Sequence, residues 1–209
     1  MVAGRDMTFK TAASRYYTTI NMELCKNWRF WPLCTSVQGN KHCRITLPDN
    51  SPIKITLRDC FCPYNASRYT QECCKMNLDI ALDAESVKIF EAIDAWVIDK
   101  LAEDPMHYFK QKLSRDEIKL LFKKSVRQHQ KDGKIFSPTL RCKIVETGPY
   151  PTRCWNKNKE KIPHPEVWKN HIITANVTIK NLWFMSAQAG VLYAIEDCIL
   201  EQQDETCPF

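Results

Sequence analysis

Alternating apolar and polar residues predict a series of short, half-buried strands. The first two such segments are 43–47 and 53–58, and the Pro- and Asn-containing stretch between them has the composition of a turn. We therefore expect these two strands to form a hairpin. Further strands are expected at 76–82, 140–144, 173–179, 181–185 and 191–200, with a turn at Ala189-Gly190 before the last.

Two stretches in the middle of the chain have the apolar period of a helix. Across 85–103, apolar residues recur every three or four positions, and the Asp-Pro pair at 104–105 ends the helix. A second helix is expected to begin at Ser114, where Glu117 three residues later completes a capping box. The Asp-Gly pair at 132–133 closes this second helix.

The order of these elements is strands, a helix pair and then strands again. It predicts an α+β fold with an antiparallel sheet, because consecutive strands joined by short turns pair antiparallel. Six or so short strands with one helical insertion favour a small barrel over a sandwich. The 209 residues suit one domain over residues 1–200, with the helical insertion at about 84–132, followed by an acidic tail at 201–209.

Composition narrows the class of protein. Apolar residues make up 44% of the chain and charged residues 26%, so a sizeable core is expected. With five glycines, the sequence holds no dinucleotide or P-loop signature. The first residues lack the apolar core of a signal peptide, and no window approaches the roughly 20 apolar residues of a membrane span. We expect an intracellular protein without a membrane partner.

Charge is unevenly distributed along the chain. The net charge is +6, but residues 75–104 hold eight acids against three bases, and residues 105–160 hold fourteen bases against five acids. Residues 196–206 then hold five acids and no base. The simplest interpretation of such segments is a charged, solvent-exposed surface without a binding role. The functional interpretation is a basic surface that binds a polyanion.

The outward positions of the predicted strands favour the functional interpretation. They carry bases, hydroxyls and an amide without an acid: Arg44, Thr46, Lys54, Thr56, Arg58, Arg141, Lys143, Asn176, Thr178 and Lys180. Any half-exposed strand can have this composition, so the pattern alone leaves both interpretations open. A sheet face of this kind with its carboxylates elsewhere would attract nucleic acid.

Aromatic residues are interleaved with the bases. Residues 26–31 combine three aromatic rings with two cations, and Trp155 stands among three cations in an expected loop at 148–165. Bases stack on aromatic rings while Lys and Arg hold phosphates, although some of these rings are expected in the core, Trp96 and Trp183 first. The predicted nucleic-acid-binding residues are Arg29, Trp31, Arg44, Lys54, Arg58, Arg141, Lys143, Arg153, Trp155 and Lys157.

The eleven cysteines raise the question of a metal site. Their odd number and the missing signal peptide favour reduced thiols over a disulfide framework. Cys60, Cys62, Cys73 and Cys74 are the weak metal candidates, but neither C-x-C nor C-C is the usual spacing of zinc ligands. We predict no metal and no cofactor.

Two other functions remain open from the residues. A metal-dependent nuclease would need clustered carboxylates, for which Asp49 and Glu117 are the candidates, although the capping box already explains Glu117. The other alternative is a structural or virion protein that uses its basic face to bind an acidic partner. No hydrolase, metalloprotease or deaminase motif is present.

The closing segment carries a family resemblance. An apolar strand with an aromatic residue at 175–185 is followed by a Gly-containing turn and the apolar strand 190–195. With the order of the earlier elements, this resembles the OB-fold single-stranded DNA-binding proteins of large nucleocytoplasmic DNA viruses. The resemblance implies an antiparallel OB-like β-barrel with an inserted helix pair, in the host cytoplasm or nucleus. It also implies sequence-tolerant, non-catalytic binding of single strands in replication, recombination or repair.

The acidic C-terminus carries a second resemblance. Glu201, Asp204, Glu205, Pro208 and Phe209 are similar to the tip of bacterial and phage single-stranded DNA-binding proteins. That likeness implies that the tail from Asp204 to Phe209 docks replication proteins. We therefore predict a non-enzymatic single-stranded DNA-binding protein, with RNA as an alternative ligand and an oligomer compatible with the pattern.

Overall fold

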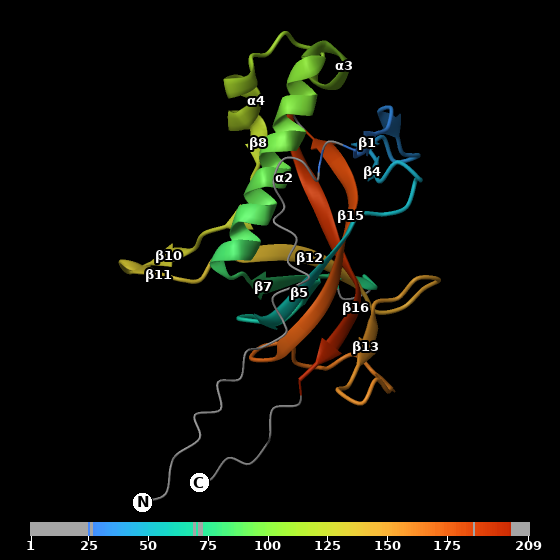
Figure 1. Cartoon of the computed structure of the whole chain (residues 1–209), viewed down its shortest axis with the longest axis vertical. Coiled ribbons are helices and arrows are strands. Elements are labelled where there is room, and N and C mark those ends of the chain that lie inside the picture. Colours follow the sequence, from blue (N-terminus) through green and yellow to red (C-terminus); the bar gives the residue numbers. More distant parts are fainter. Residues whose placement is uncertain (1–24, 26, 69, 71–72, 186, 202–209) are drawn as a thin grey trace, which may run out of the picture.

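A long antiparallel hairpin organises the computed structural model of this chain, which describes residues 25, 27–68, 70, 73–185 and 187–201. Its strands are β15 (Ile172–Met185) and β16 (Gln188–Leu200), which pair along their whole length with two register shifts. Figure 1 shows both strands running the height of the sheet. Alternation of apolar side chains along them gives the sheet a buried inner face and an opposite outer face.

The remaining strands extend the sheet on both sides of this hairpin. The main order is β2 (Cys34–Thr35), β3 (Lys41–Cys43), β15, β16, β12 (Thr139–Val145), β7 (Lys75–Ala81) and β6 (Ser67–Arg68). In addition, β5 (Lys54–Phe61) pairs with β15, β8 (Phe122–Lys123) and β13 (Arg153–Trp155) with β16, β9 (Val126–Arg127) with β12, and β14 (Lys161–Ile162) with β13. Two small sheets join β1 (Arg29–Phe30) to β4 (Ile45–Thr46), and β10 (Gln130–Lys131) to β11 (Lys134–Ile135).

The expected antiparallel barrel is wrong. Strands β5 and β7 contact each other but share no ladder, so the curled sheet does not close. The edge of β7 that would close it pairs instead with β6. The sheet is also mixed, because β8, β12 and β13 all run parallel to β16. The structure is 43% strand and 19% helical, so the sheet outweighs the helices more than the predicted α+β class implied.

The expected early hairpin forms its turn but not its ladder. Leu47 N–H donates to the Ser51 carbonyl, and a single bridge joins Thr46 to Pro52. Beyond this turn, β5 pairs with β15 over Ile172–Thr178, and β3 pairs with β15 near its end. Of the predicted strand 43–47, only Cys43 pairs with β15, because Ile45 and Thr46 form β4 and pair with β1. For β5, the long strand β15 is a longer partner than this short segment.

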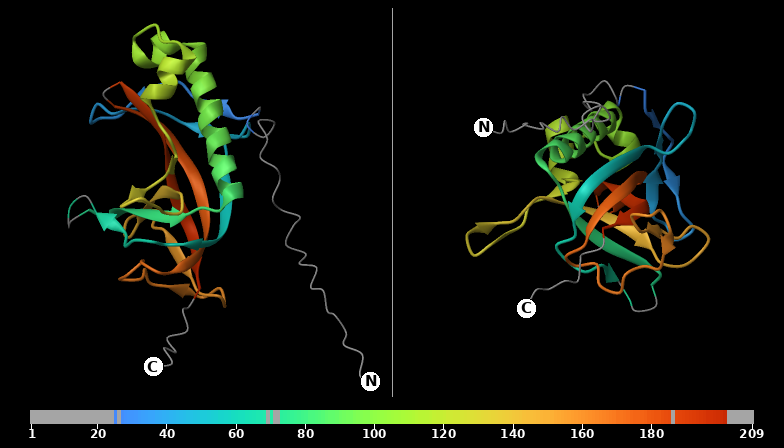
Figure 2. Two further views of the ribbon diagram at one scale, coloured as in Figure 1. Left: turned by 90° about the vertical axis from the view of Figure 1, so that its left-hand side faces the viewer. Right: turned by 60° about the horizontal axis from the view of Figure 1, so that its bottom comes forward.

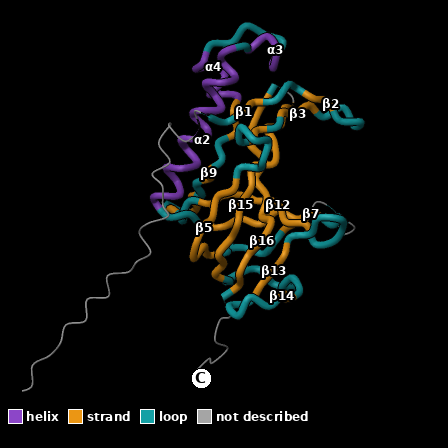
Figure 3. Tube along the Cα trace, turned by 45° about the vertical axis from the view of Figure 1, so that its right-hand side comes forward, coloured by secondary structure: helices purple, strands orange, loops and turns teal. Residues whose placement is uncertain are grey.

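The first predicted helix is confirmed as α2 (Ala84–Glu103), which begins with the Asp83 side chain accepting from Ser86 N–H. It lies along one side of the sheet (Figure 2), with Phe90 against the Tyr193 ring at 5.2 Å. Asp104 ends this helix and also caps α3 (Pro105–Phe109). Figure 3 shows the helices gathered on this side.

The second predicted helix is much shorter than expected. The capping box of Ser114 and Glu117 forms, but α4 (Arg115–Leu121) ends after seven residues and the chain continues as β8 and β9. Buried Asp94 of α2 explains why the helix stops, because its carboxylate accepts hydrogen bonds from the backbone and the hydroxyl of Ser125. The Asp-Gly pair at 132–133 forms the turn of the β10–β11 hairpin instead, which projects from the body in Figure 1.

Candidate nucleic-acid interface

The outer face of the sheet brings several predicted residues together across neighbouring strands. Register places Thr56 of β5, Asn176 of β15, Asp197 of β16 and Arg153 of β13 in one transverse row. Within that row, the Thr56 hydroxyl donates to Asn176 Oδ1 at 2.8 Å. These strands therefore form one continuous surface.

A second row crosses the outer face two residues further along β15. It runs from Lys54 through Thr178 and Ala194 to Lys143 on β12. Three strand spacings separate Lys54 from Lys143, or about 14 Å. Two residues predicted from separate parts of the chain thus lie on one surface.

Acidic side chains stand among the bases on this face, so the expectation of carboxylates elsewhere is wrong. Glu196 accepts from Lys180 at 2.9 Å and pairs with Lys54 at 3.0 Å. Asp79 of β7 accepts two hydrogen bonds from Arg141, at 2.8 and 2.7 Å. Strand pairing brings these acids beside the bases. Alternation within a single strand cannot predict which residues of other strands lie next to each other.

Glu196 occupies an extra position in β16, because the register shifts between Asn176 and Val177 of β15. Burial alone would raise the pKa of this carboxyl, but hydrogen bonds from Lys180 and Lys54 lower it below its ordinary value. The Thr178 hydroxyl also lies 3.4 Å from Glu196 Oε1 and is fully buried. Thr178 was expected to be exposed, and these longer side chains cover it.

Arg153 and Trp155 lie on the regular strand β13, and the prediction of a flexible loop for them is wrong. Arg153 pairs with Asp197 at 2.6 Å, and this hydrogen bond raises the pKa of its guanidinium. The Trp155 indole N–H donates to the same carboxylate at 3.2 Å. Asp197 therefore fixes a cation and an aromatic ring side by side on the outer face.

A hollow of about 320 Å³ lies next to the Trp155 ring. Thr174, Asn176 and Ile199 line it together with Lys159, which follows β13. Lys157 stands in the same turn, exposed, with its ammonium 3.9 Å from the Glu201 carboxylate. An aromatic ring, an amide and cations around a shallow hollow are groups that contact bases and phosphates.

Arg29, Trp31 and Arg44 form a separate group near β1 and β4. The Arg44 guanidinium lies 5.8 Å from the centre of the Trp31 ring, and the Trp31 indole donates to the Thr46 hydroxyl at 2.9 Å. Thr46 was expected to point outward and is buried instead. Arg29 is exposed opposite Thr46.

Arg58 is exposed on β5, and no ion-pair partner for it occurs within the described ranges.

Trp183 is an outer-face residue that the sequence interpretation assigned to the core. It is half-buried and pairs with Gly190 across β15 and β16. Trp96 is buried, as expected. Trp183 differs from Trp96 in having Gly190 as its cross-strand neighbour, because the glycine leaves room for a ring on the sheet surface.

The expected turn at Ala189-Gly190 is wrong. Both residues lie inside β16, and the hairpin turns between Met185 and Gln188.

The weak metal candidates do not assemble. Cys60 and Cys62 are buried, which raises the pKa of each thiol to about 12, while Cys73 and Cys74 are half-buried. Among the residues that the structure describes, no group of three or more His, Cys, Asp or Glu side chains is placed to hold a metal.

The two nuclease candidates have local structural roles. Asp49 accepts from the backbone and the hydroxyl of Ser51 in the turn after β4. Glu117 accepts from Ser114 in the capping box. Both sets of hydrogen bonds lower the pKa of the carboxyl concerned. Each carboxylate is thus engaged within its own turn or helix cap.

Part of the prediction lies outside the described residues, namely the docking tail of Asp204, Glu205, Pro208 and Phe209. No helix in the described ranges is long and apolar enough to span a bilayer.

Comparison with known proteins finds similar solved structures. No family model and no curated protein matches this chain. The single-stranded DNA-binding protein from bacteriophage Enc34, as a C-terminal truncation, is 10% identical with a TM-score of 0.44, over 85% of this chain and 97% of that one. The same protein in complex with single-stranded DNA is 8% identical with a TM-score of 0.45, over 84% and 97%.

Proposed function

We propose that this protein binds single-stranded DNA on the outer face of its sheet, without catalysing a reaction on it. The observation that carries the proposal is the continuous surface of β5, β15, β16 and β13, where Arg153, Trp155 and the row that begins at Lys54 lie together. Cations there would contact phosphates, and the ring of Trp155 would stack on a base.

The aromatic residues favour a single strand over a duplex as the ligand. A ring that projects from a sheet can stack only on a base that has left its own base stack. Trp155 and Trp183 are both half-buried on the outer face. In a duplex the bases would already be stacked on their neighbours, so these rings would add nothing to the affinity. Such a protein would act where single strands are exposed, in DNA replication, recombination or repair.

The carboxylates on the outer face can give up their cation partners to DNA phosphates. Glu196 and Asp197 hold Lys54, Lys180 and Arg153 in extended positions over the sheet. A phosphate that approaches can replace a carboxylate as the partner of each cation. Affinity for DNA is then the difference between these two sets of ion pairs, and it should fall steeply with salt.

Fluorescence anisotropy of labelled oligo-dT and of a matched duplex, at low and at physiological salt, tests the proposal. We expect tighter binding to the single strand and no cleavage with Mg²⁺. Arg58→Gln should weaken binding and reduce the salt slope by about one, because it removes one phosphate contact. Lys100→Gln, which removes a cation of α2 that pairs with Glu103, is the matched control.

Equal or negligible binding to both DNAs would overturn the proposal. A defined complex with an acidic protein would then favour the structural role. Cleavage of the labelled DNA that is lost on changing Asp49 or Glu117 would favour the nuclease.

A further inference from the structure

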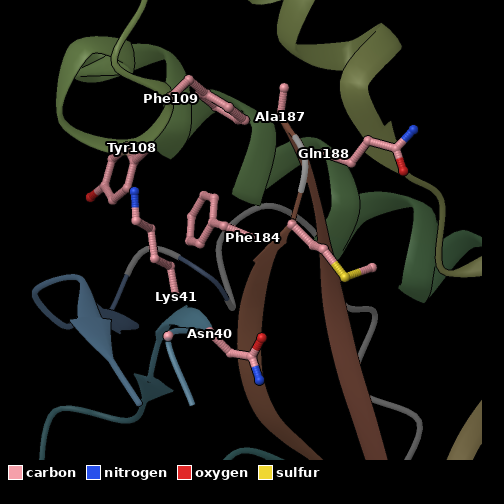
Figure 4. Close-up of a pocket in the computed structure, with 9 residues that line it drawn as sticks. Asn40, Lys41, Tyr108, Phe109, Phe184, Ala187 and Gln188 are labelled. Carbon is pink, nitrogen blue, oxygen red and sulfur yellow. The ribbon is translucent and has the colours of Figure 1, made fainter. Parts of the chain in front are cut away.

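A pocket of about 290 Å³ lies at the end of the β15–β16 hairpin, where α3 and the turn between β2 and β3 meet it (Figure 4). None of the residues that line it belongs to the predicted nucleic-acid-binding set. It is therefore a separate feature from the hollow beside Trp155.

Aromatic rings form one wall of this pocket. The Phe184 ring lies parallel to that of Tyr108, with centroids 5.7 Å apart, and meets that of Phe109 edge-on at 5.9 Å. Figure 4 shows the three rings grouped on one side. Phe184 is only 9% exposed, so the wall is held by the core.

Further rings support this wall from behind. Tyr108 meets Phe30 edge-on at 5.7 Å, and Phe30 lies 6.0 Å from the buried ring of Trp96. None of the residues of the short helix α3 is fully buried, so the ring contacts of Tyr108 and Phe109 are what hold this helix against the rest of the protein. The rings are thus fixed in place before any ligand arrives.

Polar side chains also line the pocket, at separate places around the rings. Lys41 supplies an ammonium group, and Asn40 and Gln188 supply amides. Figure 4 shows the Lys41 nitrogen near Tyr108, with Asn40 below it. Among the residues that the structure describes, no Asp or Glu lines the pocket, in contrast to the outer face. A ring wall, two amides and an uncompensated cation match an aromatic heterocycle that carries a phosphate.

Strand register connects this pocket to the outer face. Trp183 of the outer face directly precedes Phe184, and these two residues pair with His42 and Lys41 of β3. Because neighbouring residues of a strand point to opposite faces, Phe184 faces away from Trp183. A single strand that follows β15 past Lys180 would therefore reach the pocket by crossing the end of the hairpin at Met185 and Ala187, which also line it.

We propose that this pocket takes up one unpaired nucleobase of the bound single strand, with the adjoining phosphate at Lys41. The inference rests on the proposed function, because the outer face delivers the strand. The base enters against the rings of Phe184 and Phe109, with Asn40 and Gln188 at the margins of the pocket. Every base has a π-face, so the pocket accepts any of them.

Two variants test this pocket through the salt dependence and the affinity of oligo-dT binding. Phe109→Leu keeps most of the apolar volume but removes a ring that the base contacts, and we expect affinity to fall by about 5- to 100-fold. Lys41→Gln is a surface change that should reduce the salt slope by about one. The matched controls are Phe136→Leu and Lys134→Gln, a ring and a lysine that contact each other at 5.7 Å beside β11. Both controls should bind as the unchanged protein does.

Photocrosslinking supplies a result that does not depend on the stability of a variant. An oligo-dT with a single 5-iodouracil is irradiated on the unchanged protein, and the adduct is mapped by mass spectrometry. We expect adducts at Tyr108, Phe109 or Phe184.

The outcomes separate the two proposals. If oligo-dT does not bind the unchanged protein, both proposals fail. If oligo-dT binds and Trp155→Leu weakens it, while the pocket variants bind normally and adducts map only elsewhere, the base pocket alone is overturned. The pocket would then suit an apolar side chain of a partner protein.

Discussion

The indole of Trp183 lies directly on Gly190 of the neighbouring strand. A Cβ placed on Gly190 would stand 2.7 Å from the ring carbon Cζ2, closer than atoms in contact can be. Because the ring rests on backbone, it stays on the outer face of the sheet and does not enter the core. The glycine thus decides where this aromatic residue can act.

Gly190→Ala should therefore displace the Trp183 ring and lower the free energy of unfolding by about 1–3 kcal/mol, the usual cost of overpacking. Chemical denaturation measures the change. The double variant with Trp183→Leu should recover part of the loss, because the smaller side chain no longer meets the new methyl group. Equal losses in the single and double variants would show that the indole is not the cause.

Glu196→Gln should strengthen binding of single-stranded DNA. The change removes the carboxylate that pairs with Lys54 and Lys180, so both cations become available to phosphates. We expect a gain of about 0.5–1 kcal/mol, or roughly two- to fivefold, at low salt. Anisotropy titration measures it, with Glu103→Gln as a control because Glu103 pairs with Lys100 on α2. An unchanged or weaker affinity would place the DNA elsewhere.

Trp155→Leu should weaken oligo-dT binding by about 1–3 kcal/mol, the usual contribution of one stacked base. Asp197 holds the indole through its N–H but also pairs with Arg153, so Asp197→Asn loosens the ring while it frees a cation for phosphate, and the two effects should largely offset each other. Titration at one salt concentration compares both variants with the unchanged protein. A Trp155→Leu variant that folds and binds normally would remove this ring from the interface.

Asp94 should make the protein less stable as pH rises. Burial raises the pKa of this carboxyl to about 6, against an ordinary value of 3.8, despite hydrogen bonds from Ser125 that lower it. The folded state holds the proton more tightly, so stability falls as pH rises from about 4 to about 6. The loss reaches about 3 kcal/mol relative to low pH.

Asp94→Asn should remove that part of the pH dependence, and urea unfolding across this range measures the difference between the two proteins. The variant, whose amide does not titrate, should gain stability relative to the unchanged protein as pH rises. Parallel curves would show that Asp94 does not titrate in this window.

Cys154 should ionise more readily than an ordinary thiol. The Cys198 sulfur lies 3.6 Å from its own on the adjacent strand, and this hydrogen bond lowers the pKa of Cys154 against the effect of burial, with help from His164. Thiolate absorbance against pH should show a step below the ordinary value of about 8.5. Cys154→Ser should abolish the step and His164→Gln should move it upward. A step that persists in Cys154→Ser belongs to another cysteine.

Local sequence was sufficient wherever the signal lay within one element. The apolar period of α2 and its end at Asp104, the capping box at Ser114 and the alternation of β7 and β12 each depend on neighbouring residues, and all are present. The same alternation correctly placed Lys54, Thr56 and Arg58 on an exposed face.

Only the tertiary structure decided which elements meet. Residues 122–127 have a helical apolar stripe, yet Asp94 of α2 binds Ser125 and the segment pairs as strands. Sequence alternation could not show that Glu196, Asp197 and Asp79 stand beside Lys54, Arg153 and Arg141, because cross-strand register depends on partners far along the chain. The failure of β5 and β7 to pair, which leaves the barrel open, is a long-range outcome of the same kind. The sequence by itself thus determined the elements whose signal is local, such as α2, β5, β7 and β12, while the pairing of distant strands decided where the second helix ends, the charge balance of the interface and the pocket at Phe184.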